Sequence, residues 1–152
     1  MLLSVILNTV RYECHSFTDC EIKDIAYDSR RAQDGVLFVA LCGSLSDGHD
    51  YAQDAYENGS RCFLLQRRLP LPDDALQLIT EDTRAALSVI SGNFFSHPDR
   101  RLKVIGVTGT KGKTTTALMI YGILNNCGLP AGYIGSNGIL YGSFSHSAVN
   151  TT

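Results

Sequence analysis

The sequence has no strongly basic or acidic tract. Among its 152 residues, 13 Lys and Arg stand against 15 Asp and Glu, which gives a formal net charge of −2. Binding to a nucleic-acid backbone depends on clustered positive charge, so nucleic acid is not an expected partner. The hydrophobic share of 44% and the charged share of 18% are ordinary for a globular protein, and they provide enough apolar residues for a sizeable core.

The sequence also lacks the cysteine spacing of a zinc site or a disulfide framework. None of its five cysteines forms a CxxC pair; they are Cys14, Cys20, Cys42, Cys62 and Cys127. An odd and scattered set favours buried thiols in a reducing compartment. The apolar start at 1–10 is too short for a membrane span and has no basic residue before it, so it predicts a short strand or helix. Together these features predict a cytoplasmic protein without membrane insertion.

No Ser/His/Asp or Cys/His grouping suggests nucleophilic catalysis. The four histidines are isolated from one another and from any acidic pair at metal-ligand spacing; they are His15, His49, His97 and His146. We expect His49 to be a solvated loop residue and His97, which precedes Pro98, to mark the end of a helix.

The first two thirds of the chain alternate short apolar runs with turn signals. Strands are expected at 36–40, 62–65 and 76–79. A helical pattern at 51–56 ends at Asn58-Gly59, and a helix from 83 to 95 begins after Asp82, a plausible N-cap. Strand, helix and strand of these lengths predict an α/β fold built from βαβ units, with a parallel or mixed sheet.

A second unit is expected after the helix that stops before Pro98. We place the boundary so that residues 1–99 form the first domain and 100–152 the second. The second domain is predicted to contain a short buried strand at 104–108, a helix at 113–126 and a strand at 133–135. These elements are too few to close a nucleotide-binding sheet, so we expect this domain to be incomplete.

A phosphate-binding loop is predicted between that strand and that helix. It comprises Gly109, Thr110, Lys111, Gly112, Lys113, Thr114 and Thr115. Small residues let backbone N–H groups surround anionic oxygens, and the start of the helix adds a favourable dipole. Lys113 would reach the terminal phosphates of ATP, and the Thr114 hydroxyl would complete the shell of Mg²⁺. Val107 stands where the common motif has glycine, so the alternative is a Gly/Thr-rich turn that only connects strand to helix.

The loop TGTKGKTTT resembles the nucleotide loop of the Mur ligases, whose own pattern is TGTxGKT and accounts for Val107. Upstream, the run DSRR…DGVLFVALCG…DGHDYAQDAYENG is similar to the UDP-sugar-binding N-terminal domain of this family. The resemblance implies a Mur-ligase N-terminal domain followed by the truncated start of a P-loop nucleotide-binding domain. The two motifs, in the family's order, cover most of the chain.

The resemblance implies an ATP-dependent ligase of peptidoglycan synthesis. The segment at 132–138 and the closing Asn-Thr-Thr favour the member that adds a diamino acid, as the third residue, to UDP-N-acetylmuramoyl-L-Ala-D-Glu. In that reaction ATP converts the D-Glu carboxylate into an acyl phosphate, which the incoming amine attacks. The alternatives are the D-Ala-D-Ala-adding ligase of the family and a stand-alone UDP-sugar-binding module. The chain alone is not expected to catalyse the full reaction.

The resemblance also assigns residues to the acceptor. Tyr27 and Ser29 would line the uridine site, while Asn150, Thr151 and Thr152 would contact the UDP-muramoyl peptide. Lys113 is the one expected catalytic residue. The segment 44–46 would lie near the uracil or diphosphate, although it departs from the His-Gln-Ala of some relatives. Asp28 and Arg30 have an equally supported structural interpretation, in which the Asp-Ser-Arg turn caps itself.

Overall fold

The computed structural model describes residues 1–44 and 46–146. The chain divides into two compact units, Met1–Leu102 and Lys103–Thr152. Each unit is described by itself.

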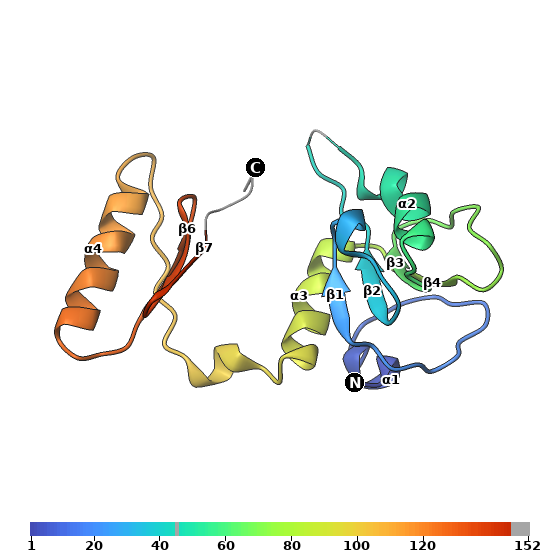
Figure 1. Cartoon of the computed structure of the whole chain (residues 1–152), viewed down its shortest axis with the longest axis horizontal. Helices are drawn as coiled ribbons and strands as arrows, with labels where there is room; N and C mark the ends of the chain where they lie inside the picture. The colour runs from blue at the N-terminus through green and yellow to red at the C-terminus, as the bar shows by residue number, and fades with distance from the viewer. Residues whose placement is uncertain (45, 147–152) are drawn as a thin grey trace. The chain divides into compact units, whose positions relative to one another are not determined.

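The first unit is built on a four-stranded parallel sheet with the order β1-β2-β3-β4 (Figure 1). The strands are β1 Asp24–Ala26, β2 Val36–Val39, β3 Cys62–Leu65 and β4 Leu76–Ile79. Every residue of the two central strands is buried. Such continuous apolar runs are typical of parallel strands that are covered on both faces. The expected α/β fold is confirmed, and of the two expected kinds of sheet, parallel or mixed, the structure has the parallel one.

Hydrophobic residues pack on both faces of this sheet. The helices of the unit are α1 Leu3–Ile6, α2 Ala52–Glu57 and α3 Thr83–Phe94. On one face, Leu37 and Val39 pack with residues of α1 and α3. On the other, Phe38 packs with residues of α2. The alternation along β2 follows from the two-residue period of a strand, which points successive side chains to opposite faces.

The ends of the two longer helices follow the sequence signals. Asp82 accepts hydrogen bonds from the backbone N–H groups of Arg84 and Ala85, at 2.9 and 3.0 Å, and so caps α3. After α2, Gly59 has a φ of 114°, a backbone conformation that glycine adopts without strain. Three short 3₁₀ turns complete the unit: η1 Ser29–Arg31, η2 Gly48–Tyr51 and η3 Pro98–Arg101.

The N-terminal segment joins the unit through contacts that the sequence did not predict. The Asn93 side-chain amide in α3 donates to the backbone oxygens of Ile6 and Asn8, at 2.8 and 2.9 Å. Glu13 and Ile79 exchange two backbone hydrogen bonds, which places the segment antiparallel beside β4. Residues at the start of the chain therefore hold both the last helix and the edge strand of the unit.

The second unit contains helix α4 Lys113–Asn126 and a small antiparallel sheet. The sheet is formed by β5 Gly132–Gly135, β6 Gly138–Tyr141 and β7 Phe144–His146, in that order. The predicted helix at 113–126 and the strand around 133–135 are confirmed. The hairpin formed by β5 and β6 was not predicted.

The buried strand expected at 104–108 is wrong. The segment has no regular structure, and Val104 and Ile105 are 79% and 60% exposed. A buried parallel strand needs neighbours that accept its backbone hydrogen bonds and cover its faces. No strand between residues 103 and 146 pairs with this segment. In the described part of the chain, no helix is long and apolar enough to cross a membrane.

Candidate functional site

The predicted phosphate loop begins and ends its turn at two glycines with unusual backbone geometry. Gly109 and Gly112 have φ values of 147° and 76°, a region that disfavours residues with a side chain. Gly112 occupies the N-cap position of α4, where the helix starts. A Cβ on Gly112 would meet no atom within 4 Å, so backbone conformation rather than space requires glycine there.

The start of α4 has donors that are available to an anion. Across residues 1–44 and 46–146, the backbone N–H groups of Lys113, Thr114 and Thr115 have no acceptor in hydrogen-bonding range. The Lys113 side chain folds back along the loop, and its Nζ donates to the backbone oxygen of Gly109 at 2.6 Å. Thr110 and Lys111 are exposed. This arrangement has the charge and the donors that a phosphate group needs.

The structure brings one further residue to the loop. The hydroxyls of Thr114 and Ser136 lie 3.2 Å apart, with Ser136 directly after β5. Sequence reasoning gave Thr114 a role in holding Mg²⁺ but gave none to Ser136. The signal that could have found Ser136 is its place after a strand that follows the loop helix. Two neighbouring hydroxyl oxygens suit a hard cation such as Mg²⁺, so the residues present fit both expected cofactors.

The predicted uridine residues lie at the carboxyl end of β1. Ligands of parallel α/β sheets bind beyond the carboxyl ends of the strands. Tyr27 follows β1 directly and is 66% exposed, while Ser29 is buried in η1. Asp28 accepts from the Arg30 backbone N–H at 3.0 Å and from Arg30 Nη2 at 2.6 Å. Asp28 and Arg30 thus stabilise the turn themselves, as the structural interpretation proposed.

A second loop follows the carboxyl end of β2 and contains the segment 44–46, expected near the uracil or diphosphate, of which Leu45 lies outside the described residues. Cys42 and Asp47 pair across its base, and the Gly43 N–H donates to the backbone oxygen of Ser46 at 2.9 Å. Gly48 closes the loop against Leu41. A Cβ at Gly48 would lie 2.6 Å from the Leu41 nitrogen, so only glycine fits this approach.

His49 holds the base of this loop, and the expectation that it is a solvated residue is wrong. It is 3% exposed, and both ring nitrogens have partners. Nδ1 lies 2.6 Å from Asp47 Oδ1, and Nε2 accepts from the Gln66 backbone N–H at 2.9 Å. The ring therefore carries its hydrogen on Nδ1, and it connects the loop to the carboxyl end of β3.

Cys42, Asp47 and His49 lie close enough together to suggest a metal site. Their hydrogen bonds argue against it, because His49 already uses both nitrogens and Arg67 Nη2 lies 2.9 Å from Asp47 Oδ2. The His49 backbone N–H and side chain, with Arg67 and Cys42, hold the pKa of the Asp47 carboxyl well below its usual range. The cluster is a structural support for the loop.

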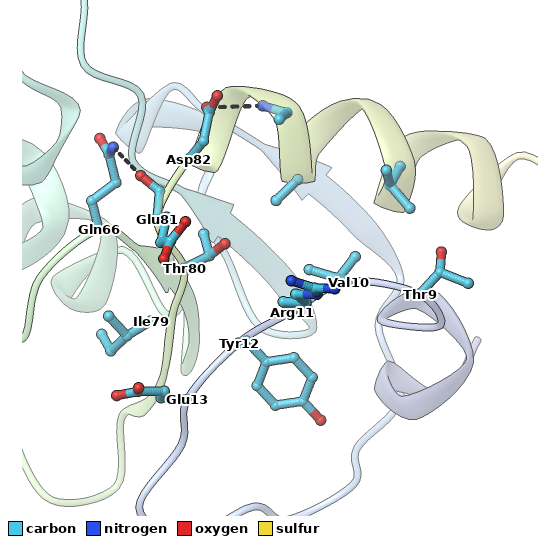
Figure 2. Close-up of a pocket in the computed structure, with 13 residues that line it drawn as sticks. Thr9, Val10, Arg11, Tyr12, Glu13, Gln66, Ile79, Thr80, Glu81 and Asp82 are labelled. Atoms are coloured by element: carbon cyan, nitrogen blue, oxygen red, sulfur yellow. Dashed lines mark hydrogen bonds between the residues drawn. The ribbon is translucent and has the colours of Figure 1, made fainter.

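A hollow of about 520 Å³ lies elsewhere on the first unit, between the N-terminal segment, the end of β4 and the start of α3 (Figure 2). Val10, Ile79 and Val89 supply apolar surface, and charges of both signs come from Arg11, Glu13 and others. Of the predicted substrate residues that the structure describes, neither Tyr27 nor Ser29 lines it. The predicted contacts Asn150, Thr151 and Thr152 lie outside the described residues.

The structure defines an α/β protein with a parallel sheet, followed by a glycine-bounded loop at the start of a helix. Residues 21–103, more than half of the chain, match the description "Mur ligase family, catalytic domain". The chain belongs to the Mur ligase family, as the sequence resemblance predicted.

Similar proteins carry the name UDP-N-acetylmuramoyl-L-alanyl-D-glutamate--2,6-diaminopimelate ligase. The chain is 37% identical to the one from Clostridium botulinum over 90% of its own length and 29% of that relative. Identity with the one from Clostridium perfringens is 35%, over 100% of this chain and 32% of that relative. Identity with the one from Chlorobium phaeobacteroides is 42%, over 84% of this chain and 25% of that relative. The chain thus spans about a third or less of these relatives.

Solved structures similar to the chain include those of another member of the family. The chain superposes on MurF from Acinetobacter baumannii with a TM-score of 0.64 at 31% identity, covering 81% of this chain and 27% of that one. With MurF ligase from Thermotoga maritima in complex with ADP, the TM-score is 0.53 at 28% identity, covering 68% and 23%. Both likenesses support the family and the fold.

Proposed function

We propose that this chain is the acceptor-binding and phosphate-loop portion of the ligase that adds a diamino acid to UDP-N-acetylmuramoyl-L-Ala-D-Glu. The observation that carries the proposal is the loop at 109–115, with its Lys113 and its Thr114–Ser136 hydroxyl pair, in a chain at least 35% identical to ligases named for this reaction. The incoming amino acid would be diaminopimelate, by analogy with those names. Because its substrates are soluble nucleotides, the proposed site of action is the cytoplasm.

The loop would hold the phosphates of ATP. The N–H groups at the start of α4 would donate hydrogen bonds to an anionic oxygen, and Lys113 would leave Gly109 to neutralise the terminal phosphate. Thr114 and Ser136 would orient Mg²⁺ through their hydroxyl oxygens. Bound ATP supplies the phosphoryl group that makes the acceptor carboxylate reactive.

The first unit would hold the UDP end of the acceptor, away from the chemistry. Tyr27 offers an exposed ring beside the turn at Ser29. After β2, Gly48 packs against Leu41 and His49 holds Asp47. Binding energy gained at a remote, rigid site positions the reacting carboxylate. Asn150, Thr151 and Thr152 remain proposed contacts with the peptide of this acceptor.

The D-Ala-D-Ala-adding ligase remains a second candidate, because the similar solved structures include a ligase of that name from Acinetobacter baumannii. The two enzymes differ in their acceptor. One takes the UDP-muramoyl dipeptide and the other the UDP-muramoyl tripeptide, so the acceptor that supports ADP formation distinguishes them.

The test is Lys113→Ala in the complete enzyme that carries this chain. We expect ADP formation with the UDP-muramoyl dipeptide to fall by about 10²-fold or more, because a charge aimed at the transferring phosphoryl group is lost. Binding of the UDP substrate should change less than twofold. Lys103→Ala, which removes an exposed lysine of the same unit, is the matched control and should keep full activity.

Two results would overturn the assignment. Near-normal turnover by Lys113→Ala would show that Lys113 makes no important contact with the transferring phosphate. A chain that binds the UDP-muramoyl dipeptide, but whose complete protein forms no ADP with either acceptor, would instead be a UDP-sugar-binding module.

A further inference from the structure

Two cysteines that are far apart in sequence meet at the amino end of β3. The Sγ atoms of Cys20 and Cys62 lie 3.2 Å apart, although 42 positions separate the residues. Both are free thiols. Cys62 is the first residue of β3 and is buried, whereas Cys20 is partly exposed. The pair takes no part in the sites described above.

The backbone on each side of the pair is held in place. The Leu3 N–H donates to the backbone oxygen of Cys20 at 2.9 Å, and Leu2 pairs with Glu21 in an antiparallel bridge. Cys62 pairs with Leu37 of β2 on one side and Leu76 of β4 on the other. Backbone hydrogen bonds of the fold therefore keep the two sulfurs next to each other. A movement of about 1 Å would bring them to the S–S bonding distance of about 2.0 Å.

We propose that Cys20 and Cys62 form a site of reversible oxidation, at which a peroxide converts the two thiols into an intramolecular disulfide. Their separation and fixed backbones carry this inference. The other three cysteines, at positions 14, 42 and 127, have no thiol within hydrogen-bonding distance among the described residues.

The reaction proceeds in two balanced steps. The Cys20 sulfur, which is the more accessible of the two, loses its proton and attacks one oxygen of hydrogen peroxide. The S–O bond forms, the O–O bond breaks, and the hydroxide leaves with that proton as water. Cys62 then attacks the Cys20 sulfur; the S–S bond forms, the S–O bond breaks, and the departing hydroxide takes the Cys62 thiol proton and leaves as a second water. The two thiols are oxidised by two electrons and one peroxide is reduced to two waters.

The order of the steps follows from the surroundings of Cys62. Burial, followed by the hydrogen bond with Cys20, raises the pKa of the Cys62 thiol. A buried protonated thiol reacts poorly with peroxide, so Cys20 reacts first and Cys62 resolves the product.

The position of the pair predicts what the disulfide changes. It would tie the segment around Cys20 to the start of β3, whereas Tyr27 and the loop at 42–47 follow the carboxyl ends of β1 and β2. We therefore expect oxidation to raise the resistance of the first unit to unfolding, because a long loop of the unfolded chain is closed. Binding of uridine diphosphate should be unchanged.

The first experiment treats the reduced 152-residue chain with one equivalent of hydrogen peroxide, blocks the remaining thiols and maps the peptides without reduction. Trypsin combined with a protease that cleaves before aspartate separates 19–23, which holds Cys20, from the peptide that holds Cys14; Cys62 lies in 62–67. We expect one linked pair, 19–23 with 62–67, two hydrogens lighter than the free peptides and separated by dithiothreitol. Linkage of other cysteines, or sulfinic acid at Cys20 without linkage, would overturn the proposal.

The second experiment uses Cys20→Ser with Cys14→Ser as its matched control, since both are partly exposed residues of the same segment. Peroxide should raise the melting temperature of the wild-type chain and of Cys14→Ser by several degrees, and that of Cys20→Ser not at all. An equal rise in Cys20→Ser would show that another group is responsible. Should Cys20→Ser fold poorly, the ratio of linked to free 62–67 peptide in Cys14→Ser still decides the question.

Discussion

Ser136 Oγ lies 3.2 Å from Thr114 Oγ1, although 22 positions separate the two residues. The contact joins the first turn of α4 to the residue that follows β5. The contact places a residue from outside the loop motif next to Thr114, the residue proposed to hold Mg²⁺. Both hydroxyls should therefore contribute to binding the ion.

Thr114→Ala and Ser136→Ala should each weaken the Mg²⁺-dependent part of nucleotide binding by about tenfold, the usual effect of removing one hydrogen-bonding oxygen from a charged ligand. The double variant should lose less than the product of the two effects, because neighbouring residues that share a ligand are not additive. Calorimetry with ATP and Mg²⁺ provides the measurement. Thr116→Ala, an exposed threonine of the same helix, is the control. Independent effects would show that the two hydroxyls do not share an ion.

Tyr27→Ala should weaken binding of the UDP-muramoyl dipeptide, with little effect on stability. The ring is 66% exposed, so its removal opens no cavity, whereas the loss of base stacking is worth about 1–3 kcal/mol. Asp28→Ala should do the reverse, since its carboxylate caps η1, and caps are worth about 1 kcal/mol. Fluorescence binding and urea unfolding of both variants give the comparison. Normal binding of the UDP-muramoyl dipeptide by Tyr27→Ala would show that Tyr27 does not contribute to the uridine site.

Asp47→Asn should destabilise the first unit by about 1–2 kcal/mol near neutral pH, because hydrogen bonds to His49 and Arg67 lose their charge. The pKa of Asp47 is lowered in the folded chain, so its contribution is full above the unfolded value of about 3.9 and is lost as the pH falls below it. The difference between variant and wild type should therefore shrink between about pH 5 and pH 3. Urea unfolding as a function of pH measures this, with Asp50→Asn as the neighbouring exposed control. If the difference in the free energy of unfolding grew as the pH fell, Asp47 would not be the group whose lowered pKa stabilises the folded chain.

Gly48→Ala should cost the first unit about 2 kcal/mol or more. The new Cβ would lie 2.6 Å from one backbone atom of Leu41 and 2.8 Å from another, and backbone atoms cannot move aside. Gly92→Ala in α3 is the matched control, because its Cβ would meet only the His97 side chain, at 3.1 Å. That contact can relax, and alanine favours a helix interior, so the net effect should be small. Equal shifts of the denaturant midpoint in the two variants would show that the close approach of Gly48 to the Leu41 backbone does not require glycine.

The fold of the first unit was largely predictable, because its signals are local. The apolar run at 62–65 and the cap at Asp82 can each be recognised from a few neighbouring residues. Signals of this kind predicted α3 and a parallel or mixed sheet, and the sheet is parallel. The prediction of a strand at 104–108 was wrong because it depends on contacts that are not local. The apolar residues of this segment match the pattern of a buried strand, but a buried strand needs neighbouring strands, and none in the described chain pairs with it.

The candidate sites divide in the same way. Contiguous motifs located the loop at 109–115, and its residues remain predicted ligands. The place of Ser136 beside Thr114 and the buried role of His49 depend on contacts between elements that are separate in sequence, which no spacing in the sequence encodes. For His49 the run DGHD predicted a turn, and solvent exposure did not follow from it.

The Asn93 amide, which binds two backbone oxygens close to the chain's start, has a consequence for how the first unit assembles. The contacts span 87 and 85 positions, so forming them closes long loops of the unfolded chain at a cost in chain entropy. Until α3 has left the ribosome, α1 has no such anchor, and the growing polypeptide cannot complete this unit. Slow amide hydrogen exchange should therefore appear in both helices at once, as one cooperative block.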